Sequence, residues 1–278
     1  MDAGPLEWRT LTASVRGASH ERSGLPNQDT VRDYRLDGGC AWLLALADGH
    51  GSAKSFRSQH GSRLAVGAMR RVCGHLSALE HPSRIKRWAE DQLPLELTRA
   101  WLAWVDSHIR CQPFTPDELD ALDAKARAQV EAHPPLAYGS TLLAIVAAPG
   151  FILYLQLGDG DILVVNASGE VERPFPRDPR LLANETTSLC SPQAWNEVRV
   201  RFQVLASAPP ALILAATDGY ANAYRDEANF QQVALDYWSL LRDGGEAAVK
   251  PYLCDWLNEA SQQGSGWPTS SCGCWAAC

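Results

Sequence analysis

The chain has 278 residues, of which 46% are hydrophobic and 21% are charged, so its length allows one large domain or two small ones. Six Phe, seven Tyr and ten Trp supply bulky side chains for a core, which excludes a largely disordered chain. The 32 Asp and Glu outnumber the 25 Lys and Arg and give a net charge of −7, the wrong sign for a protein that neutralises nucleic-acid phosphates. These numbers predict a globular protein with no nucleic-acid partner.

No segment approaches the roughly 20 apolar residues of a membrane helix, and the first ten residues, MDAGPLEWRT, lack the apolar region of a secretion signal. Five of the eight cysteines are scattered singly, which is typical of reduced thiols in the cytosol. The other three, Cys272, Cys274 and Cys278, have no fourth ligand at the spacing usual for zinc. We therefore expect a cytoplasmic protein that does not contact a membrane.

The apolar pattern predicts a strand, then a helical block, then a region rich in strands. Residues 40–47 form a nearly continuous apolar run, as in a strand buried on both faces. Helix-like apolar spacing follows over residues 61–79, 85–93, 96–109 and 117–131, the last preceded by a Thr-Pro cap. Short apolar runs then predict strands over residues 142–148, 151–157, 162–165, 199–205 and 212–216, and a final helix is expected over about 250–263.

Two short turns connect the first three strands of the last region. Residues 148–150 and 158–161 are too few for parallel crossovers, so they predict hairpin turns that join the three strands into an antiparallel meander. No internal repeat or long linker divides the chain. The sequence therefore predicts a single domain over residues 1–266, followed by an atypical tail over 267–278.

Three aspartates share one local context, because each ends an apolar run and immediately precedes a glycine: Asp48, Asp159 and Asp218. A carboxylate at the end of a rigid strand, beside a glycine that permits close approach, is a well-placed hard oxygen donor for Mg²⁺ or Mn²⁺. Asp-Gly is also a common turn dipeptide, and Asp159 in particular lies in what looks like an ordinary hairpin. The residues alone leave a divalent-metal site and three simple turns as open alternatives.

Two further polar residues lie near these carboxylates in the sequence. Asp29 is either another ligand or an exposed turn carboxylate. His50 follows Asp48 by two residues, where it either donates a proton to a leaving group near neutral pH or faces solvent.

Five motifs occur in the order G-A-S-H…P-N-Q-D, A-D-G-H-G, G-S-T-L, L-G-D-G-D and A-T-D-G-Y. In this order they resemble the metal-dependent protein phosphatases of the 2C type, most of all their compact bacterial branch, over roughly residues 14–263. The resemblance implies an α+β fold, a four-layer α-β-β-α sandwich of two antiparallel sheets flanked by helices. It also implies a signalling hydrolase whose partner is a phosphoprotein substrate of a serine/threonine kinase.

The resemblance implies two divalent cations, Mg²⁺ or Mn²⁺, and a weaker third. Asp48 matches the aspartate that bridges both metals, Gly49 the residue whose backbone carbonyl binds one of them, and Asp218 a ligand of the other. Asp159 matches the carboxylate linked to the third metal, and Asp29 the acidic residue of the amino-terminal motif.

The same resemblance assigns the residues that act on the substrate. His50 matches the proposed general acid, and residues 139–141 match a structural motif beside the site. The family usually has an arginine upstream of the amino-terminal acidic motif to hold the phosphate. Here that region offers His20 as a possible phosphate contact and Arg22 as a weaker one.

The implied chemistry is direct hydrolysis of phosphoserine or phosphothreonine by a water that bridges two metals. No cysteine has an arginine six positions later, so the loop of a cysteine phosphatase is absent from the sequence. Two cations also supply the local positive charge that a chain of net charge −7 needs in order to receive a phosphate.

The carboxy terminus departs from the family pattern. The family has an Asp-Asp or Asp-Asn pair after a Gly-Ser-Gly-like loop and then an apolar closing strand, whereas residues 266–272 here are GWPTSSC and no acid follows Glu259. We therefore expect one metal ligand and one core strand to be missing. Either the ending is an altered reading of the gene, or the protein is a genuine variant with a weakened or absent metal.

Three functions remain open at this point. The first is a Mg²⁺- or Mn²⁺-dependent serine/threonine phosphoprotein phosphatase. The second is a catalytically weak or inactive pseudophosphatase that acts as a regulatory phosphoprotein-binding module, which the missing terminal aspartate favours. The third is a metal-dependent phosphohydrolase that acts on small phosphate esters.

Overall fold

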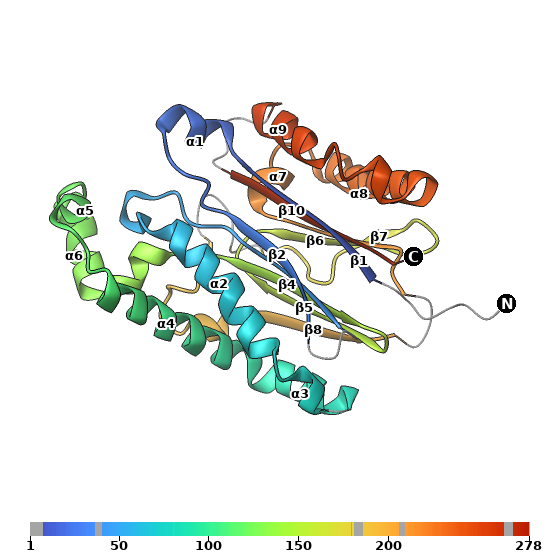
Figure 1. Cartoon of the computed structure of the whole chain (residues 1–278), viewed down its shortest axis with the longest axis horizontal. Coiled ribbons are helices and arrows are strands. Elements are labelled where there is room, and N and C mark those ends of the chain that lie inside the picture. The colour runs from blue at the N-terminus through green and yellow to red at the C-terminus, as the bar shows by residue number, and fades with distance from the viewer. Residues whose placement is uncertain are drawn as a thin grey trace.

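The computed structural model describes residues 8–36, 41–79, 81–178, 180, 186–205, 209–263 and 269–277. Within these residues, two antiparallel sheets pack face to face, and helices cover both outer faces of the pair (Figure 1). Sheet A has the strand order β1-β10-β9-β6-β7, and sheet B has the order β2-β3-β4-β5-β8. The expected four-layer sandwich of the α+β class is confirmed.

Sheet B contains β2 (Thr30–Arg35), β3 (Trp42–Ala47), β4 (Leu142–Ala148), β5 (Phe151–Leu157) and β8 (Arg199–Val204), and all of these except β2 fall on predicted apolar runs. The three central strands, β3, β4 and β5, are almost entirely buried. A strand buried on both faces needs a continuous apolar run rather than an alternating one, which is why the sequence marked these strands clearly. Cys40, the predicted first residue of β3, lies outside the described residues.

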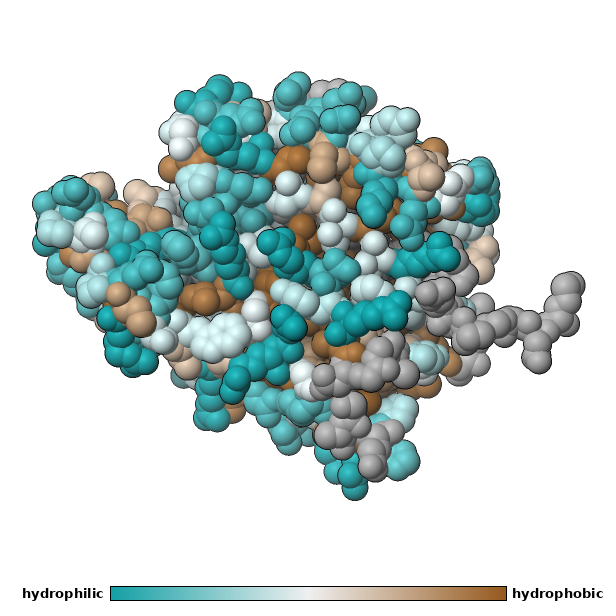
Figure 2. Space-filling model, viewed as in Figure 1, coloured by the Kyte–Doolittle hydropathy of each residue, from teal (hydrophilic) through white to brown (hydrophobic). Residues whose placement is uncertain are grey.

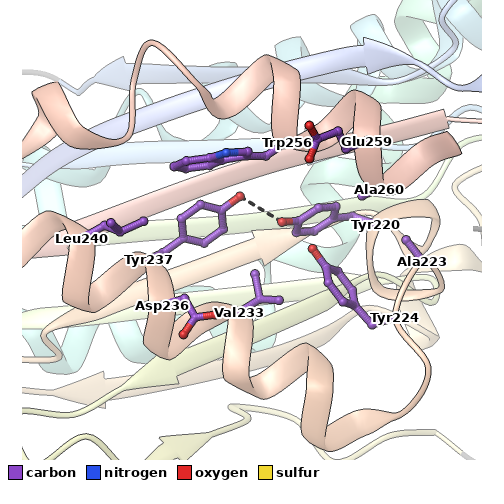
Figure 3. Close-up of a pocket in the computed structure, with 10 residues that line it drawn as sticks. All are labelled: Tyr220, Ala223, Tyr224, Val233, Asp236, Tyr237, Leu240, Trp256, Glu259 and Ala260. Atoms are coloured by element: carbon purple, nitrogen blue, oxygen red, sulfur yellow. Dashed lines mark hydrogen bonds between the residues drawn. The ribbon is translucent and has the colours of Figure 1, made fainter. Parts of the chain in front are cut away.

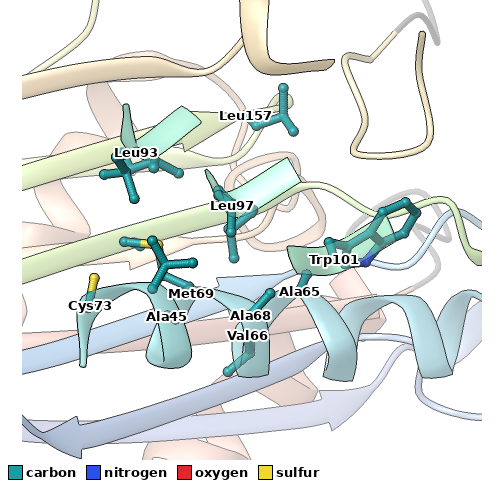
Figure 4. Packing of buried hydrophobic residues seen from close by; sticks show 14 of the residues in the cluster. Ala45, Ala65, Val66, Ala68, Met69, Cys73, Leu93, Leu97, Trp101 and Leu157 are labelled. Atoms are coloured by element: carbon teal, nitrogen blue, oxygen red, sulfur yellow. The ribbon is translucent and has the colours of Figure 1, made fainter. Parts of the chain in front are cut away.

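The outer face of sheet B is covered by α2 (Ser58–Cys73), α3 (Pro82–Asp91) and α4 (Leu93–Cys111). Met69 of α2 and Leu97 and Trp101 of α4 are fully buried between these helices and the sheet (Figure 4). The predicted helix over 117–131 is wrong, because it is two helices, α5 (Pro116–Asp120) and α6 (Ala124–Ala132). The Asp123 side chain accepts a hydrogen bond from the Ala126 amide at 2.7 Å and begins the second helix.

Sheet A consists of β1 (Trp8–Arg16), β6 (Asp161–Val165), β7 (Val171–Glu172), β9 (Leu212–Ala216) and β10 (Thr269–Ala277). Its outer face is covered by α8 (Glu227–Gly244) and α9 (Leu253–Gln263), with α1 (Ala18–Ser23) and α7 (Asp218–Ala221) at one end (Figure 1). Between the two sheets, Leu44 and Leu46 of β3 meet Ile162 of β6 and Ile213 of β9. Each such buried side chain contributes about 1.5–3 kcal/mol to stability.

The expectation that the closing strand is missing is wrong. Residues Thr269–Ala277 form β10, which pairs along its whole length with β1 and over residues 272–276 with β9. A strand in the middle of a sheet is held by backbone hydrogen bonds on both edges, which small residues form as well as large ones, and Pro268 precedes the first paired residue. The predicted domain end at residue 266 lies outside the described residues and stays a prediction.

The predicted three-stranded meander is wrong at its second turn. β4 and β5 form the expected hairpin, but β6 pairs with β9 in sheet A instead of with β5. Residues 158–160 therefore carry the chain from one sheet to the other. The Gln156 side chain stabilises this crossing by donating a hydrogen bond to the Gly160 carbonyl at 2.7 Å.

Arg57 joins the start of α2 to the connection between α4 and α5. Its guanidinium donates to both carboxylate oxygens of Glu118 at 2.7 Å and to the carbonyl oxygens of Gln112 at 2.6 Å and Pro113 at 3.0 Å. It also donates to the Tyr138 hydroxyl at 3.0 Å. The planar guanidinium matches the two carboxylate oxygens at once, so Arg57 holds three separate segments together.

Stability should fall in acid as Glu118 loses its charge. The hydrogen-bonded Arg57 guanidinium lowers the pKa of Glu118 from 4.5 to about 2. Because the pKa is depressed in the folded state, the ion pair stabilises the fold fully above about pH 4.5, and this contribution is lost as the pH falls toward 2. Urea denaturation of the wild type and of Glu118→Gln should show a smaller difference in unfolding free energy at pH 3 than at pH 7. An equal difference at both pH values contradicts this assignment.

Candidate active site

Asp48 and Asp218 come from different sheets and meet at one end of the sandwich. Asp48 directly follows β3 of sheet B, and Asp218 begins α7 just after β9 of sheet A. Their side chains hydrogen-bond to each other. Both residues keep part of their surface exposed, although their carboxyl groups are largely withdrawn from water, which raises the pKa of each. The two carboxyl groups that the sequence predicted to converge are therefore in contact.

The backbone of Asp48 is held by the segment that precedes β4. The Thr141 amide donates to the Asp48 carbonyl at 2.9 Å, and the Asp48 amide donates to Thr141 Oγ1 at 3.1 Å. Gly49 pairs with Ser140 as an isolated bridge, which continues the ladder of β3 and β4. The motif over residues 139–141 thus positions the end of β3.

Gly49 occupies a position where only glycine fits. A Cβ at this position would lie 2.7 Å from the Gln28 carbonyl oxygen and 2.8 Å from the Ser58 carbonyl oxygen. The backbone of the amino-terminal loop and the start of α2 therefore both approach Gly49 closely. This packing draws the loop that carries Asp29 next to Asp48.

Asp29 is a buried neighbour of the carboxyl pair. Only 7% of its surface is exposed, and its Oδ2 accepts a hydrogen bond from Thr217 Oγ1 at 3.0 Å. Burial raises the pKa of both Asp48 and Asp218, and the charge of Asp29 raises them further. The interpretation of Asp29 as an exposed turn carboxylate is therefore wrong.

Asp159 lies in the turn that crosses from β5 to β6. Burial raises its pKa to about 6, and the nearby charge of Asp218 adds to the rise. The Thr186 side chain forms a hydrogen bond with it and acts in the opposite direction. The sheet-to-sheet crossing, rather than an ordinary hairpin, is what brings this carboxylate toward Asp218.

His50 packs against residue 139 beside the site. The His50 amide donates to the Gly139 carbonyl at 3.0 Å, and a Cβ on Gly139 would lie only 2.4 Å from His50 Cδ2. Burial lowers the pKa of His50 to about 4, and the charge of Lys54 lowers it further. In the chain without substrate, the imidazole is therefore uncharged at neutral pH.

The two residues predicted to contact phosphate lie in different surroundings. His20 is only 3% exposed, and its Nδ1 lies 3.1 Å from the Pro26 carbonyl oxygen. Its Nε2 would lie 3.7 Å from a Cβ on Gly51, in the loop that follows His50. Arg22 is exposed on the surface of α1. The geometry therefore brings His20, but not Arg22, against the loop that carries Asp48.

The site concentrates negative charge. Asp48 and Asp218 touch, and both Asp29 and Asp159 raise the pKa of Asp48 through their charge. Within the described residues, no three His, Cys, Asp or Glu side chains are arranged to hold a metal ion by themselves. What the fold assembles is a pair of carboxyl groups with two acidic neighbours, all of them hard oxygen donors.

Three residues that act on the predicted site residues were not themselves predicted. Thr217 donates to Asp29, Thr186 hydrogen-bonds to Asp159, and the charge of Lys54 acts on His50. Thr217 stands directly before Asp218 in the A-T-D-G-Y motif, so that motif held a usable signal. Thr186 and Lys54 carry no pattern of their own, because a single hydroxyl or ammonium has no characteristic spacing.

Solved structures similar to this one are protein phosphatases. The catalytic domain of the serine/threonine phosphatase PstP, in complex with two manganese ions, is 20% identical, with a TM-score of 0.52 over 98% of this chain and 99% of that chain. A serine/threonine phosphatase of S. agalactiae is 17% identical, with a TM-score of 0.55 over 97% and 99%. PppA, from Pseudomonas aeruginosa, is 16% identical, with a TM-score of 0.56 over 98% of both chains. At these identities the similarity establishes the fold.

Curated sequences and membrane-spanning helices give no further match. No curated protein matches this chain in sequence. Among the described residues, no helix has the length and hydropathy required to span a membrane.

The sequence itself matches a family profile, described as Protein phosphatase 2C, over residues 16–258. That range includes the five motifs and every residue of the site described above. The strand order, the convergence of Asp48 with Asp218 and this match agree with one another. The chain belongs to the protein phosphatase 2C family.

Proposed function

We propose that the protein is a Mg²⁺- or Mn²⁺-dependent serine/threonine phosphoprotein phosphatase. The observation that carries the proposal is the hydrogen bond between Asp48 and Asp218, two carboxyl groups that lie 170 residues apart in the chain and belong to different sheets. Two largely buried carboxyl groups in contact are costly to the fold unless a proton or a cation lies between them. Such a pair is therefore typical of a functional site rather than of a structural one.

The donor set fits divalent cations of the hard type. Asp48, the Gly49 carbonyl and Asp218 would hold them, with Asp29 and Asp159 as outer acidic neighbours. Once bound, such cations lower the pKa of water and neutralise charge on phosphoryl oxygens. The PstP catalytic domain, solved with two manganese ions, supports this choice of cation.

The remaining residues act on the substrate. His20, held through Nδ1 by the Pro26 carbonyl, presents Nε2 toward the loop that carries Asp48 and is the better candidate for a phosphate contact than the exposed Arg22. His50 is proposed to give a proton to the departing hydroxyl group of the substrate. Since its pKa is lowered in the free chain, the negative charge of a bound phosphate has to raise it for this step.

The substrate class is proposed from the family and its bacterial relatives. PppA of Pseudomonas aeruginosa is described as a key regulatory component of a secretion system, which supports a role in bacterial signalling. We propose a phosphoprotein substrate of a serine/threonine kinase in the cytoplasm, without nucleic acid or membrane as a partner.

A pseudophosphatase is the second candidate function. No acidic residue follows Glu259, and no ready-made metal cluster is found among the described side chains. Such a protein would keep the sandwich and bind phosphoproteins without hydrolysing them.

Turnover measurements separate these functions. Hydrolysis of p-nitrophenyl phosphate, of a phosphothreonine peptide and of a small sugar phosphate should be compared with and without Mn²⁺. Manganese-dependent turnover of the peptide supports the phosphatase, and preference for the sugar phosphate supports the small-ester hydrolase. Tight binding of the peptide without any turnover supports the pseudophosphatase and contradicts the first proposal.

Gly139→Ala should displace His50 and slow the release of a basic leaving group. The new Cβ would lie 2.4 Å from His50 Cδ2, so the ring has to move. We expect turnover of the phosphothreonine peptide to fall about tenfold, because its alkoxide leaving group needs a proton, whereas p-nitrophenyl phosphate needs none and should change less. Gly150→Ala is the matched control, since no atom lies within 4 Å of a Cβ there. Equal losses on both substrates contradict the role of His50.

A further inference from the structure

A cavity lies among the helices that cover sheet A, between α7, α8 and α9. Its volume is about 340 Å³, which is within the range of small-molecule sites. The carboxyl pair of the candidate active site does not line it. Ten of the described residues line it (Figure 3), and they are of three kinds: aromatic (Tyr220, Tyr224, Tyr237, Trp256), aliphatic (Ala223, Val233, Leu240, Ala260) and acidic (Asp236, Glu259).

The aromatic side chains of the cavity are held in fixed positions by one another. The Tyr220 and Tyr237 hydroxyl groups are hydrogen-bonded at 2.9 Å (Figure 3). The Tyr237 and Trp256 ring centroids are 5.7 Å apart, and those of Tyr220 and Tyr224 are 5.3 Å apart with the rings nearly perpendicular. Tyr220 and Tyr237 are almost fully buried, whereas Tyr224 and Trp256 are partly exposed. The cavity therefore has a rigid aromatic wall that reaches the surface.

Among the described residues that line the cavity, two are charged, and both are acidic. Asp236 comes from α8 and Glu259 from α9, and Figure 3 shows them on opposite sides of the aromatic group. Both residues are exposed, and no Lys, Arg or His is among the ten lining residues. The net charge of −7 adds to the negative potential around the cavity. An anionic ligand would be repelled and a cationic one attracted.

We propose that this cavity is a binding site for a small organic cation that carries an ammonium group on an apolar body. Faces of Tyr and Trp rings attract an ammonium ion through the ring quadrupole, and a carboxylate attracts it through its charge. The aliphatic side chains, among them Val233 and Leu240, supply the apolar contacts that an alkyl chain needs. A bare metal cation does not fit, because Asp236 and Glu259 lie on opposite sides of the aromatic group and do not converge on one point as metal ligands must.

Calorimetric titration of the full-length chain with n-hexylammonium chloride tests the proposal. Sodium hexanoate and hexanol are the matched probes, because they have the same alkyl chain with a negative or neutral head. We expect hexylammonium to bind at least tenfold more tightly than either, and to bind more weakly as ionic strength rises. No binding of hexylammonium, or equal binding of the three probes, overturns the proposal.

Substitutions in the lining residues test whether hexylammonium binds in this cavity. The double variant Asp236→Asn and Glu259→Gln keeps the side-chain shapes and removes both charges, so it should weaken hexylammonium binding about tenfold or more. Asp255→Asn, which removes an exposed acid of α9 outside the cavity, is the control and should bind like the wild type. Unchanged binding by the double variant overturns the proposal. Thermal denaturation of each variant verifies that it is folded, and the result does not depend on phosphatase activity.

Discussion

Asp48→Asn should remove most of the phosphatase activity and at the same time make the metal-free chain more stable. Asparagine keeps the shape of the side chain but loses the charge that is proposed to hold divalent cations. That interaction is worth several kcal/mol in the transition state, so kcat/KM on a phosphothreonine peptide with Mn²⁺ should fall about 10³-fold.

Asp48→Asn is expected to raise the stability of the metal-free chain, although it lowers the activity, because of the electrostatic cost of the charged carboxyl group. Burial, the charge of Asp29 and contact with Asp218 raise the pKa of Asp48 in the folded chain. A carboxyl group whose pKa is raised on folding costs stability above its ordinary value of 3.8, so a neutral amide removes that cost at pH 7. In the presence of EDTA, we expect the Tm measured by circular dichroism to rise by a few degrees.

The control for this prediction is Asp255→Asn, which removes an exposed carboxylate of α9. Its activity and its Tm should match those of the wild type. A drop in Tm for Asp48→Asn in EDTA would show that Asp48 is a structural residue. Retention of activity by Asp48→Asn would exclude it from the catalytic site.

Arg57→Ala should lower the free energy of unfolding by about 3 kcal/mol, the lower end of the range for removal of one partner of a buried ion pair, because the Glu118 side chain is itself 28% exposed. The Arg57 side chain is only 9% exposed, and its loss removes the hydrogen bonds that it donates to the Glu118 carboxylate and to two backbone carbonyl oxygens. It also removes the cation that lies 4.8 Å from the centre of the Phe114 ring. Urea denaturation at pH 7 measures the change.

Arg127→Ala is the matched control for Arg57→Ala. Arg127 also bonds to two carboxylates, those of Asp120 and Glu131, but all three side chains are well exposed to solvent. Exposed ion pairs gain little because water competes for both partners, so the unfolding midpoint should not change measurably. Equal destabilisation by both substitutions would mean that burial does not decide the strength of the Arg57 cluster.

Much of the fold was predictable because burial leaves a direct mark on composition. β4, β5 and β9 are buried on both faces, and the structure places them at the residues where the sequence has apolar runs, broken in β5 only by Gln156. The helices of the block over residues 58–111 were predictable for a related reason, since each presents one apolar stripe to sheet B. Asp48 and Asp218 could be named in advance because each ends such a run and precedes a glycine.

Other features depended on how distant segments pack, and no local pattern encodes that. Whether the turn at 158–160 reverses within one sheet or crosses to the other depends on which partner strand is available, and β9 pairs with β6. β10 has the small residues of a loop, yet it becomes a central strand because β1 and β9 offer unpaired backbone groups on both sides.

The sequence by itself therefore determined the strands that carry apolar runs, most of the helices, and which carboxylates stand at strand ends, because the pattern that burial imposes is readable within a few residues. Only the tertiary structure decided that Asp29 accepts a hydrogen bond from Thr217, 188 residues away, and that three helices enclose an aromatic and acidic cavity. These contacts join residues whose separation along the chain says nothing about their distance in space. The first exists because two sheets pack face to face and bring the ends of their strands to the same edge, and the second because α7, α8 and α9 pack together on the outer face of sheet A.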